Sequence, residues 1–365
     1  MGKSKRRICG RAIYISNKDF RGKSRERNPL KAVLSGRSDF AAVLGEAREF
    51  VAPGLDRVHR IMETVAHGAP GKLSGHLQDL LQRRGKRVRS TFLLLFSQCA
   101  GSADAERAAR VCAAVELVHL ASLIHDDIID GSDLRRDEKT AHQRWGNRVA
   151  VLLGDYALAK AMEMVWSDPD ARIPLSICRA SSRLIRAEIQ EVERAGKTDL
   201  TVEGYFEIIE GKTAALFEAC GECGALLAGL DERGERHGAA LGRGFGVAFQ
   251  IVDDMLDFGV NVDGLGKRTF SDVKNGFLTL PMILFYKVCS PEAREEMQAL
   301  LKDPLPAANQ MRIREMLEEH EALRKARDMA TGQALAGLPF LESLRETPAS
   351  MHLRQVCALM THRTD

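Results

Sequence analysis

Aromatic residues are scarce in this chain, at 5% of its 365 residues, and no stretch alternates apolar and polar residues with period two. Sheet proteins depend on aromatic and β-branched residues in such alternating patterns. From about residue 40 onward, apolar residues instead recur at three- and four-residue spacing, in a sequence dominated by Ala, Leu, Arg and Glu. Ala, Leu, Arg and Glu are strong helix formers. The absences exclude a sheet-based fold, and the pattern predicts an all-α protein.

Long apolar runs are also missing. No window approaches the ~20 apolar residues of a membrane span, and no apolar run of about 7 to 15 residues follows Arg6 and Arg7, as a secretory signal would require. We therefore expect a soluble, cytoplasmic protein without stable membrane insertion. Residues 1–38 carry about a dozen Lys and Arg against Asp19 and Glu26, without interleaved aromatics. This composition predicts a disordered basic arm rather than a nucleic-acid site, with an organelle transit peptide as the alternative.

Neither a disulfide framework nor a zinc site is indicated. The eight cysteines are scattered, mostly within apolar helical patterns, and only Cys220 and Cys223 have metal-ligand spacing. No second CxxC motif or His pair accompanies them, so we expect reduced core thiols. The body, residues 39–365, also lacks a Gly/Ser/Pro-rich linker and a fixed-period repeat. It is predicted to form one helical domain of about ten helices.

Two aspartate clusters share the same spacing, and each ends an apolar helical run. Residues 125–130 read HDDIID after an apolar run, and residues 250–257 read QIVDDMLD after another. Aspartates four residues apart lie on one face of a helix and repel each other, so we expect a cation to offset the repulsion. Such carboxylates suit Mg²⁺, whose other ligands are waters and phosphate oxygens. A single cluster of this kind is equally well explained as a solvated helix end. Two clusters with identical spacing instead predict a metal-dependent diphosphate site.

Basic residues stand beside both clusters, where cationic side chains would meet a metal-bound diphosphate. They are Lys86, Arg87 and Arg89 before an apolar helix, Arg135 and Arg136 after the first cluster, Lys212 next to Thr213, and Lys267 beyond the second cluster. Arginine suits bidentate phosphate contacts, whereas lysine acts as a point charge. Any one of them alone would be a surface charge, and it is their placement that favours phosphate binding.

Taken together, the motifs resemble those of the trans-isoprenyl diphosphate synthases, also called polyprenyl synthetases, from about residue 45 to Arg363. Five motifs occur in order, namely GKRxR at 85–89, HDDxxDxxDxRR at 125–136, KT at 212–213, QxxDDxxD at 250–257 and GKxxxSDxxxGxxTLP at 266–281. The resemblance implies a homodimer in which each subunit is a single large helical bundle around a deep central cavity. It also implies Mg²⁺-dependent addition of isopentenyl diphosphate to an allylic diphosphate such as farnesyl or geranylgeranyl diphosphate.

The resemblance further implies a role for each matching residue. The catalytic residues would be Asp126, Asp127, Asp130, Lys212, Thr213, Gln250, Asp253, Asp254 and Asp257. Of these, Asp126, Asp130, Asp253 and Asp257 would hold Mg²⁺, about three ions with bound diphosphate. The allylic diphosphate would contact Arg135, Lys212, Thr213, Gln250 and Lys267, and isopentenyl diphosphate would contact Lys86, Arg89, His119 and Arg136.

Two small residues bear on product length. Ser122 and Ala121 precede Asp126 by four and five residues, which puts them about one turn (~5.4 Å) deeper on the same helix. We expect both to point into the cavity and to leave it open. By the resemblance, an open cavity implies a long product, of about 30 to 50 carbons.

The sequence departs from the family pattern at several positions. These are Arg84, Asp137 and Ala187, each usually Gly, with Ser90 for Pro, Glu191 for Gln and Phe277 for Lys. These departures put substrate affinity and reaction rate in question more than the type of reaction, because both aspartate clusters are intact. A short-chain synthase (about C15 to C20) and a non-catalytic partner subunit of a heteromeric synthase remain alternatives. A terpene cyclase would normally lack the second aspartate cluster and the GKRxR motif.

Overall fold

The structure is a computed structural model that describes residues 40–83, 85–101, 104–135, 138–194, 199–259, 270–302 and 305–362. The predicted basic arm, residues 1–38, lies outside the described residues. The same holds for four of the residues that the sequence singles out, namely Arg84, Arg136, Asp137 and Lys267.

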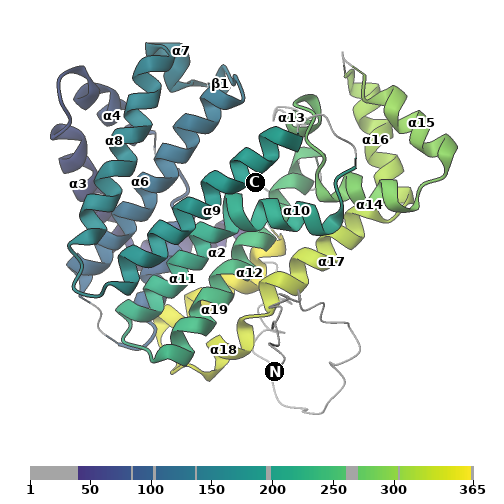
Figure 1. The fold of residues 1–365 in the computed structure, drawn as a ribbon. Coiled ribbons are helices and arrows are strands. Elements are labelled where there is room, and N and C mark those ends of the chain that lie inside the picture. The colour runs from purple at the N-terminus through teal and green to yellow at the C-terminus, as the bar shows by residue number, and fades with distance from the viewer. Residues whose placement is uncertain are drawn as a thin grey trace, which may run out of the picture.

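The described chain is helical almost throughout (Figure 1). Its first part forms α2 (Phe40–Phe50), α3 (Ala52–His67), α4 (Lys72–Gln82), α5 (Val88–Ser97), α6 (Ala105–Ile129), β1 (Leu134–Arg135), β2 (Glu138–Lys139), α7 (Ala141–Trp145) and α8 (Asn147–Trp166). There follow α9 (Arg172–Arg194), α10 (Val202–Ile209), the π-helical turn η1 (Glu210–Ala214), α11 (Ala215–Leu227), α12 (Glu232–Asp257) and α13 (Ser271–Lys274). The last part forms α14 (Leu280–Val288), α15 (Pro291–Leu300), α16 (Ala307–Glu319), α17 (Ala322–Leu335), α18 (Leu338–Ser343), α19 (Pro348–Leu359) and the 3₁₀ turn η2 (Met360–His362). The predicted all-α class is confirmed.

The prediction of about ten helices was too low, since the labels run from α2 to α19 within the described residues. Several helix breaks fall at residues other than Gly and Pro, so they carry no such signal in the sequence. Between α16 and α17, for example, the break falls at Glu321, a non-glycine residue with φ +57°. The two-residue strands β1 and β2 pair antiparallel, with Leu134 opposite Lys139. So short a hairpin leaves no period-two pattern to detect.

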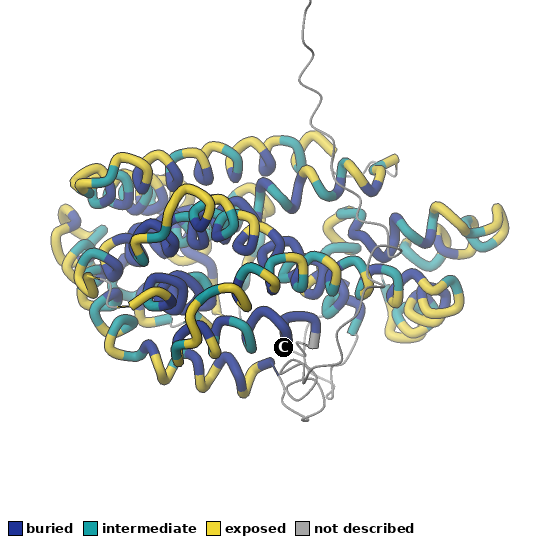
Figure 2. Tube along the Cα trace, turned by 90° about the horizontal axis from the view of Figure 1, so that it is seen from below, coloured by how far each residue is buried: buried dark blue, intermediate teal, exposed yellow. Residues whose placement is uncertain are grey.

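Helix α6 is the central helix of the core. The expectation that no segment is apolar enough to span a membrane is wrong for this helix, whose 25 residues reach a mean hydropathy of 1.4 over the most apolar window. However, 72% of that window is buried inside the protein, where α6 packs against α3, α5, α8 and α11. A helix that is apolar all round and enclosed by other helices belongs to the core of a large protein. The outer helices instead carry exposed residues on their outward sides only (Figure 2).

Helices α11 and α12 cross unusually closely, and glycine makes this possible. A Cβ on Gly221 would lie 2.0 Å from the carbonyl oxygen of Gly238, and one on Gly242 would lie 2.1 Å from that of Phe217. Side chains at these positions would force the helices apart. The close crossing brings the turn that precedes α11 next to α12, so η1 and the second aspartate cluster become neighbours. Cys220 and Cys223 are fully buried free thiols in this region, as predicted.

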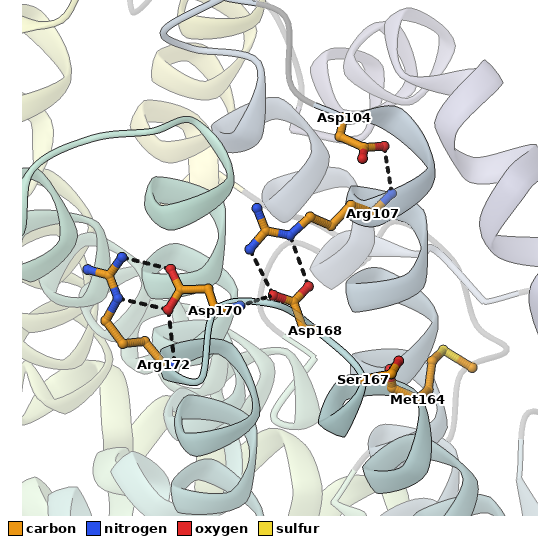
Figure 3. Close-up of polar contacts among 7 residues, drawn as sticks. All are labelled: Asp104, Arg107, Met164, Ser167, Asp168, Asp170 and Arg172. Carbon is orange, nitrogen blue, oxygen red and sulfur yellow. Dashed lines mark hydrogen bonds and ion pairs between the residues drawn. The ribbon is translucent and has the colours of Figure 1, made fainter.

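Paired charges anchor the beginning of α6 (Figure 3). Asp104 caps the helix, because its carboxylate accepts hydrogen bonds from the backbone N–H groups of Glu106 and Arg107 at 3.0 Å each. The guanidinium of Arg107 donates to both carboxylate oxygens of Asp168, at 3.0 and 2.8 Å. Asp168 follows α8, so this bidentate pair ties α6 to the loop between α8 and α9.

Candidate active site

One large cavity, of about 960 Å³, receives side chains from nearly every predicted motif. Twelve of the residues predicted to act in the site line it, namely Lys86, Arg89, His119, Ser122, Asp126, Asp130, Arg135, Lys212, Thr213, Gln250, Asp253 and Asp254. Three described candidates, Ala121, Asp127 and Asp257, are not among the lining residues. The helical bundle around a central cavity is therefore present as predicted, and the motifs converge on that cavity.

The first aspartate cluster splits into two kinds of carboxylate at the end of α6. Asp126 and Asp130, four residues apart, line the cavity. Asp127 points away from it, is 5% exposed, and accepts a hydrogen bond from Nε of Arg135 on β1 at 2.7 Å. Burial and the nearby Glu188 carboxylate raise the pKa of Asp126 to about 7. Its negative charge is thus poorly compensated in the absence of a cation.

Lys212 faces the first cluster from the π-helical turn η1. Its ammonium group forms an ion pair with Glu191 and lies 3.0 Å from Glu188 Oε2, both on α9. Burial alone would lower the pKa of Lys212, but the two carboxylates outweigh it and the pKa is raised. Turns of π-helix often mark functional sites, because the extra residue redirects side chains. Here the turn carries both Lys212 and Thr213 into the cavity wall.

The second cluster is held by a chain of hydrogen bonds. Thr213 Oγ1 donates to Gln250 Oε1 at 2.6 Å, and Gln250 Nε2 donates to Asp254 Oδ1 at 2.7 Å. The Tyr205 hydroxyl donates to the other oxygen of Asp254 at 2.5 Å. Burial raises the pKa of Asp254 despite these donors. Asp254 therefore braces the wall between η1 and α12, whereas its neighbour Asp253 is exposed at the cavity.

Asp257, the last member of the second cluster, binds to the segment beyond it. Its Oδ1 accepts hydrogen bonds from the backbone N–H and the hydroxyl of Ser271 at 2.9 and 2.7 Å, and its Oδ2 accepts from the backbone N–H of Asp272 at 3.1 Å. Asp272 lines the cavity in its place, and its pKa is raised by burial and by the neighbouring carboxylates of Asp254 and Asp257. Sequence reasoning missed Asp272, although it lies within the last recognised motif.

A cationic group occupies another part of the wall, at the start of α5. Nη1 of Arg89 lies 3.0 Å from Nε2 of His119, so the ring nitrogen accepts and its other nitrogen carries the proton. The guanidinium of Arg89 also stacks over Phe217, 4.8 Å from the ring centroid. Burial lowers the pKa of Arg89, because its guanidinium cation is poorly solvated there. An incoming anion would relieve this cost.

The two residues considered for product length face different ways. Ser122 lines the cavity, and its hydroxyl donates to the carbonyl oxygen of His119 at 2.9 Å. Ala121 is 2% exposed and packs in the core, so the expectation that both residues point into the cavity is wrong for Ala121. Consecutive residues are about 100° apart around a helix. Only one of the pair can share the face of Asp126, and that is Ser122, four residues earlier.

The structure accounts for two of the departures from the family pattern. Ala187 fits against η1 because residue 211 is glycine, at which a Cβ would lie only 2.5 Å from that of Ala187. Glu191, in place of Gln, forms the ion pair with Lys212. Phe277 lines the cavity at the place where the family usually has Lys. The composition of the cavity wall is therefore changed at Glu191 and Phe277 but not at the aspartates.

Divalent metal ions would suit this cavity. Among the described residues, no three His, Cys, Asp or Glu side chains converge closely enough to form a complete metal site. Mg²⁺ does not require one, because it binds through one or two carboxylates and takes waters and phosphate oxygens as its other ligands. The desolvated charge of Asp126, beside Asp130 and opposite Asp253, fits that kind of partial protein shell.

Comparison with known proteins identifies the class. The polyprenyl synthetase family model matches residues 70–319. This chain therefore belongs to the polyprenyl synthetase family, which is a family of prenyltransferases.

Particular relatives are consistent with that membership. The chain is 33% identical over 304 residues to a nonaprenyl diphosphate synthase of Mycobacterium tuberculosis, covering 82% of this chain and 89% of the relative. It is 36% identical over 234 residues to heptaprenyl diphosphate synthase component 2 of Geobacillus stearothermophilus, covering 64% of this chain and 73% of the relative. A crystal structure of a decaprenyl diphosphate synthase from Rhodobacter capsulatus superposes with a TM-score of 0.81 at 26% identity, covering 88% of this chain and 99% of that one.

Proposed function

We propose that this chain is a Mg²⁺-dependent polyprenyl diphosphate synthase that adds isopentenyl diphosphate to an allylic diphosphate, farnesyl or geranylgeranyl diphosphate. The observation that best supports this is one cavity lined by carboxylates from both clusters, by Lys212, and by the cations Lys86 and Arg89. Such a wall suits two diphosphates, one bound through metal ions and one bound directly.

The allylic diphosphate belongs in this proposal with the carboxylates. Asp126 and Asp130 would hold Mg²⁺ from α6, with Asp253 opposite. Both oxygens of Asp257 accept hydrogen bonds from Ser271 and Asp272, so we leave Asp257 out of this set. Arg135, Lys212 and Lys267 would neutralise the remaining phosphate charge. Bound Mg²⁺ supplies neutralisation of the departing diphosphate. Glu188 and Glu191 hold the Lys212 ammonium in the absence of substrate, and the diphosphate would compete with them for it.

Isopentenyl diphosphate belongs with the cationic group at the start of α5, formed by Lys86, Arg89 and His119, and with Arg136. The allylic C–O bond breaks, and the diphosphate leaves with the bonding electron pair. The double bond of isopentenyl diphosphate then attacks the allylic carbon, a C–C bond forms, and a proton passes to the released diphosphate. The hydroxyl oxygen of Thr213 and the amide oxygen of Gln250, fixed by their mutual hydrogen bond, would stabilise the cation electrostatically.

The product is proposed to be long. Ser122 is small and lines the cavity one turn below Asp126, and most of the wall beyond the charged groups is apolar, including Leu80, Leu120 and Ile209. A bulky side chain at Ser122 would close that space. A short-chain product and a non-catalytic subunit are the alternatives that the experiment below separates.

We further propose a cytoplasmic homodimer that pairs through α8 and α9. Among the described residues, seven of the twelve large apolar side chains that are exposed lie on these two helices, including Leu152 (55%), Trp166 (77%) and Ile189 (54%). Monomeric proteins rarely gather so much exposed apolar surface on neighbouring helices. A change of Ile189 to Glu should therefore shift the protein from dimer to monomer in light scattering, whereas a protein that is monomeric before the change would contradict the proposal.

The experiment is incubation of the purified protein with Mg²⁺, labelled isopentenyl diphosphate and farnesyl diphosphate, followed by chain-length analysis of the products. A ladder that ends at one long polyprenol supports the whole proposal. Products that stop at C15 or C20 would keep the reaction and refute the long chain. No incorporation with any allylic primer would refute the reaction and favour a partner subunit.

A further inference from the structure

Glu116 is a buried carboxylate that the proposed reaction does not use directly. It lies on α6, three residues before His119, and is 7% exposed. A buried carboxylate is costly unless hydrogen bonds and a cation satisfy it. The partners of Glu116 therefore show what it is there to hold.

Among the described residues, the hydrogen bonds that Glu116 accepts come from the segment that begins α5. Its Oε2 accepts from Nη1 of Arg87 at 2.8 Å. Its Oε1 accepts from the hydroxyl of Ser90 at 2.6 Å and from the backbone N–H of Ser90 at 3.3 Å. These contacts bracket the segment that carries Lys86 and Arg89, the side chains proposed to bind isopentenyl diphosphate.

The segment needs such a partner because its backbone is strained. Arg87 precedes α5 with φ +52°, in the left-handed region that non-glycine residues rarely adopt. The backbone N–H of Ser90 is in the first turn of the helix, where no carbonyl within the helix can accept it. Glu116 meets both needs, since it pairs with the Arg87 side chain and accepts the Ser90 N–H.

Ser90 is one of the departures from the family pattern. The family pattern has Pro here, whose ring fixes φ but which offers neither an N–H nor a hydroxyl. Ser90 is fully buried and donates twice to Glu116. Hydrogen bonds to Glu116 thus replace the conformational restraint that proline would supply.

We infer that Glu116 is a positioning residue for isopentenyl diphosphate, acting through Arg87 and Ser90 to hold Lys86 and Arg89 at a fixed distance from His119. All of these contacts are on the isopentenyl side of the cavity. The inference rests on the proposed function, because it assigns the start of α5 to isopentenyl diphosphate.

The test is the effect of Glu116→Gln on the two substrates separately. Glutamine cannot pair with the charge of Arg87, so the KM for isopentenyl diphosphate should rise about tenfold while the KM for farnesyl diphosphate changes less than about twofold. Ser90→Ala should raise the KM for isopentenyl diphosphate about threefold. Ser90→Thr keeps the hydroxyl and should leave this KM unchanged. The double variant Ser90→Ala with Glu116→Gln should have the same KM as Glu116→Gln alone.

Asp168→Asn is the matched control, since it removes a buried carboxylate that pairs with an arginine at the other end of α6. It should lower the unfolding temperature and leave both KM values unchanged. The inference is overturned if Glu116→Gln lowers only the unfolding temperature, or if it raises both KM values equally. Ser90→Ala decides the same question should Glu116→Gln fail to fold.

Calorimetric titration of isopentenyl diphosphate separates this inference from the proposed function. If the wild-type protein binds isopentenyl diphosphate but does not turn it over, the proposed reaction is refuted. The Kd of Glu116→Gln for isopentenyl diphosphate, compared with that of wild type, then still tests the positioning role. A Kd raised about tenfold supports the positioning role. An unchanged Kd overturns it, and so does a wild-type protein that binds no isopentenyl diphosphate.

Discussion

The carboxylates near the beginning of α6 are matched by arginines, whereas Asp126 at its end faces a cavity with too little positive charge. At the beginning, Asp168 receives two hydrogen bonds from Arg107. Burial alone would raise the pKa of Asp168, but these bonds outweigh it and the pKa is lowered. At the end, burial and Glu188 raise the pKa of Asp126 to about 7. A satisfied carboxylate thus lies beside the beginning of α6, and an unsatisfied one lies at its end.

The difference separates a contact that stabilises the fold from a carboxylate placed for function, at opposite ends of the same helix. A carboxylate with a lowered pKa stabilises the folded state, and one with a raised pKa destabilises it when ionised. The chain tolerates a carboxylate with a raised pKa at the cavity, where a metal-bound diphosphate would compensate its charge. Sites that are strained or unsatisfied without their ligand are expected at functional positions.

The largest effect should come from Asp126→Asn, which removes charge at the cavity and changes little in volume. If Asp126 holds Mg²⁺, turnover should fall on the order of a thousandfold, because the leaving diphosphate loses its neutralising ion. The measurement is incorporation of labelled isopentenyl diphosphate at saturating Mg²⁺. Activity within about tenfold of wild type would show that Asp126 is not needed for metal binding.

Asp168→Asn should lower stability rather than turnover. Loss of the bidentate pair leaves Arg107 half-buried without its partner, which should cost about 2 to 3 kcal/mol of unfolding free energy and leave turnover unchanged. Because the pKa of Asp168 is lowered in the folded state, its stabilisation is present above the unfolded pKa and is lost as the pH falls through the folded value. The difference in unfolding free energy between wild type and variant, measured by urea denaturation, should therefore shrink below about pH 4. A difference that persists at acid pH would contradict this explanation.

Ser122→Phe should shorten the product, since it places an aromatic ring in the cavity wall below Asp126. The readout is chain length under otherwise identical conditions, with Ala121→Phe as the comparison. Ala121 is buried outside the cavity wall, so its replacement should destabilise the core rather than set a defined shorter length. The same defined shortening from both variants would refute the distinction between the two residues.

Glu191→Gln should have the smallest effect. The change restores the usual family residue and removes one carboxylate from Lys212, so the KM for the allylic diphosphate should fall by about threefold. Glu193→Gln, on the exposed side of the same helix, makes the same change in net charge and should have no effect. A raised KM in Glu191→Gln would mean that the carboxylate orients Lys212 rather than competing for it.

Patterns within single segments predicted much of this structure from sequence. Helical periodicity gave the all-α class, and the paired DDxxD motifs gave the residues at the cavity. The orientation of individual side chains was harder, because it depends on contacts between distant segments. Asp127 turns to Arg135, Asp257 turns to Ser271, and Ala121 turns into the core. Glu116 gave no signal either, since its role depends on the start of α5, 26 residues earlier in the chain.

The most direct test of the contrast between the two ends of α6 is the unfolding free energy of Asp126→Asn at pH 8 without metal ions. At that pH the wild-type carboxylate is ionised at a half-buried position, so the account predicts that the variant is more stable than wild type, by about 1 to 2 kcal/mol. A variant less stable than wild type would show that Asp126 is as well satisfied as Asp168, and would contradict the account.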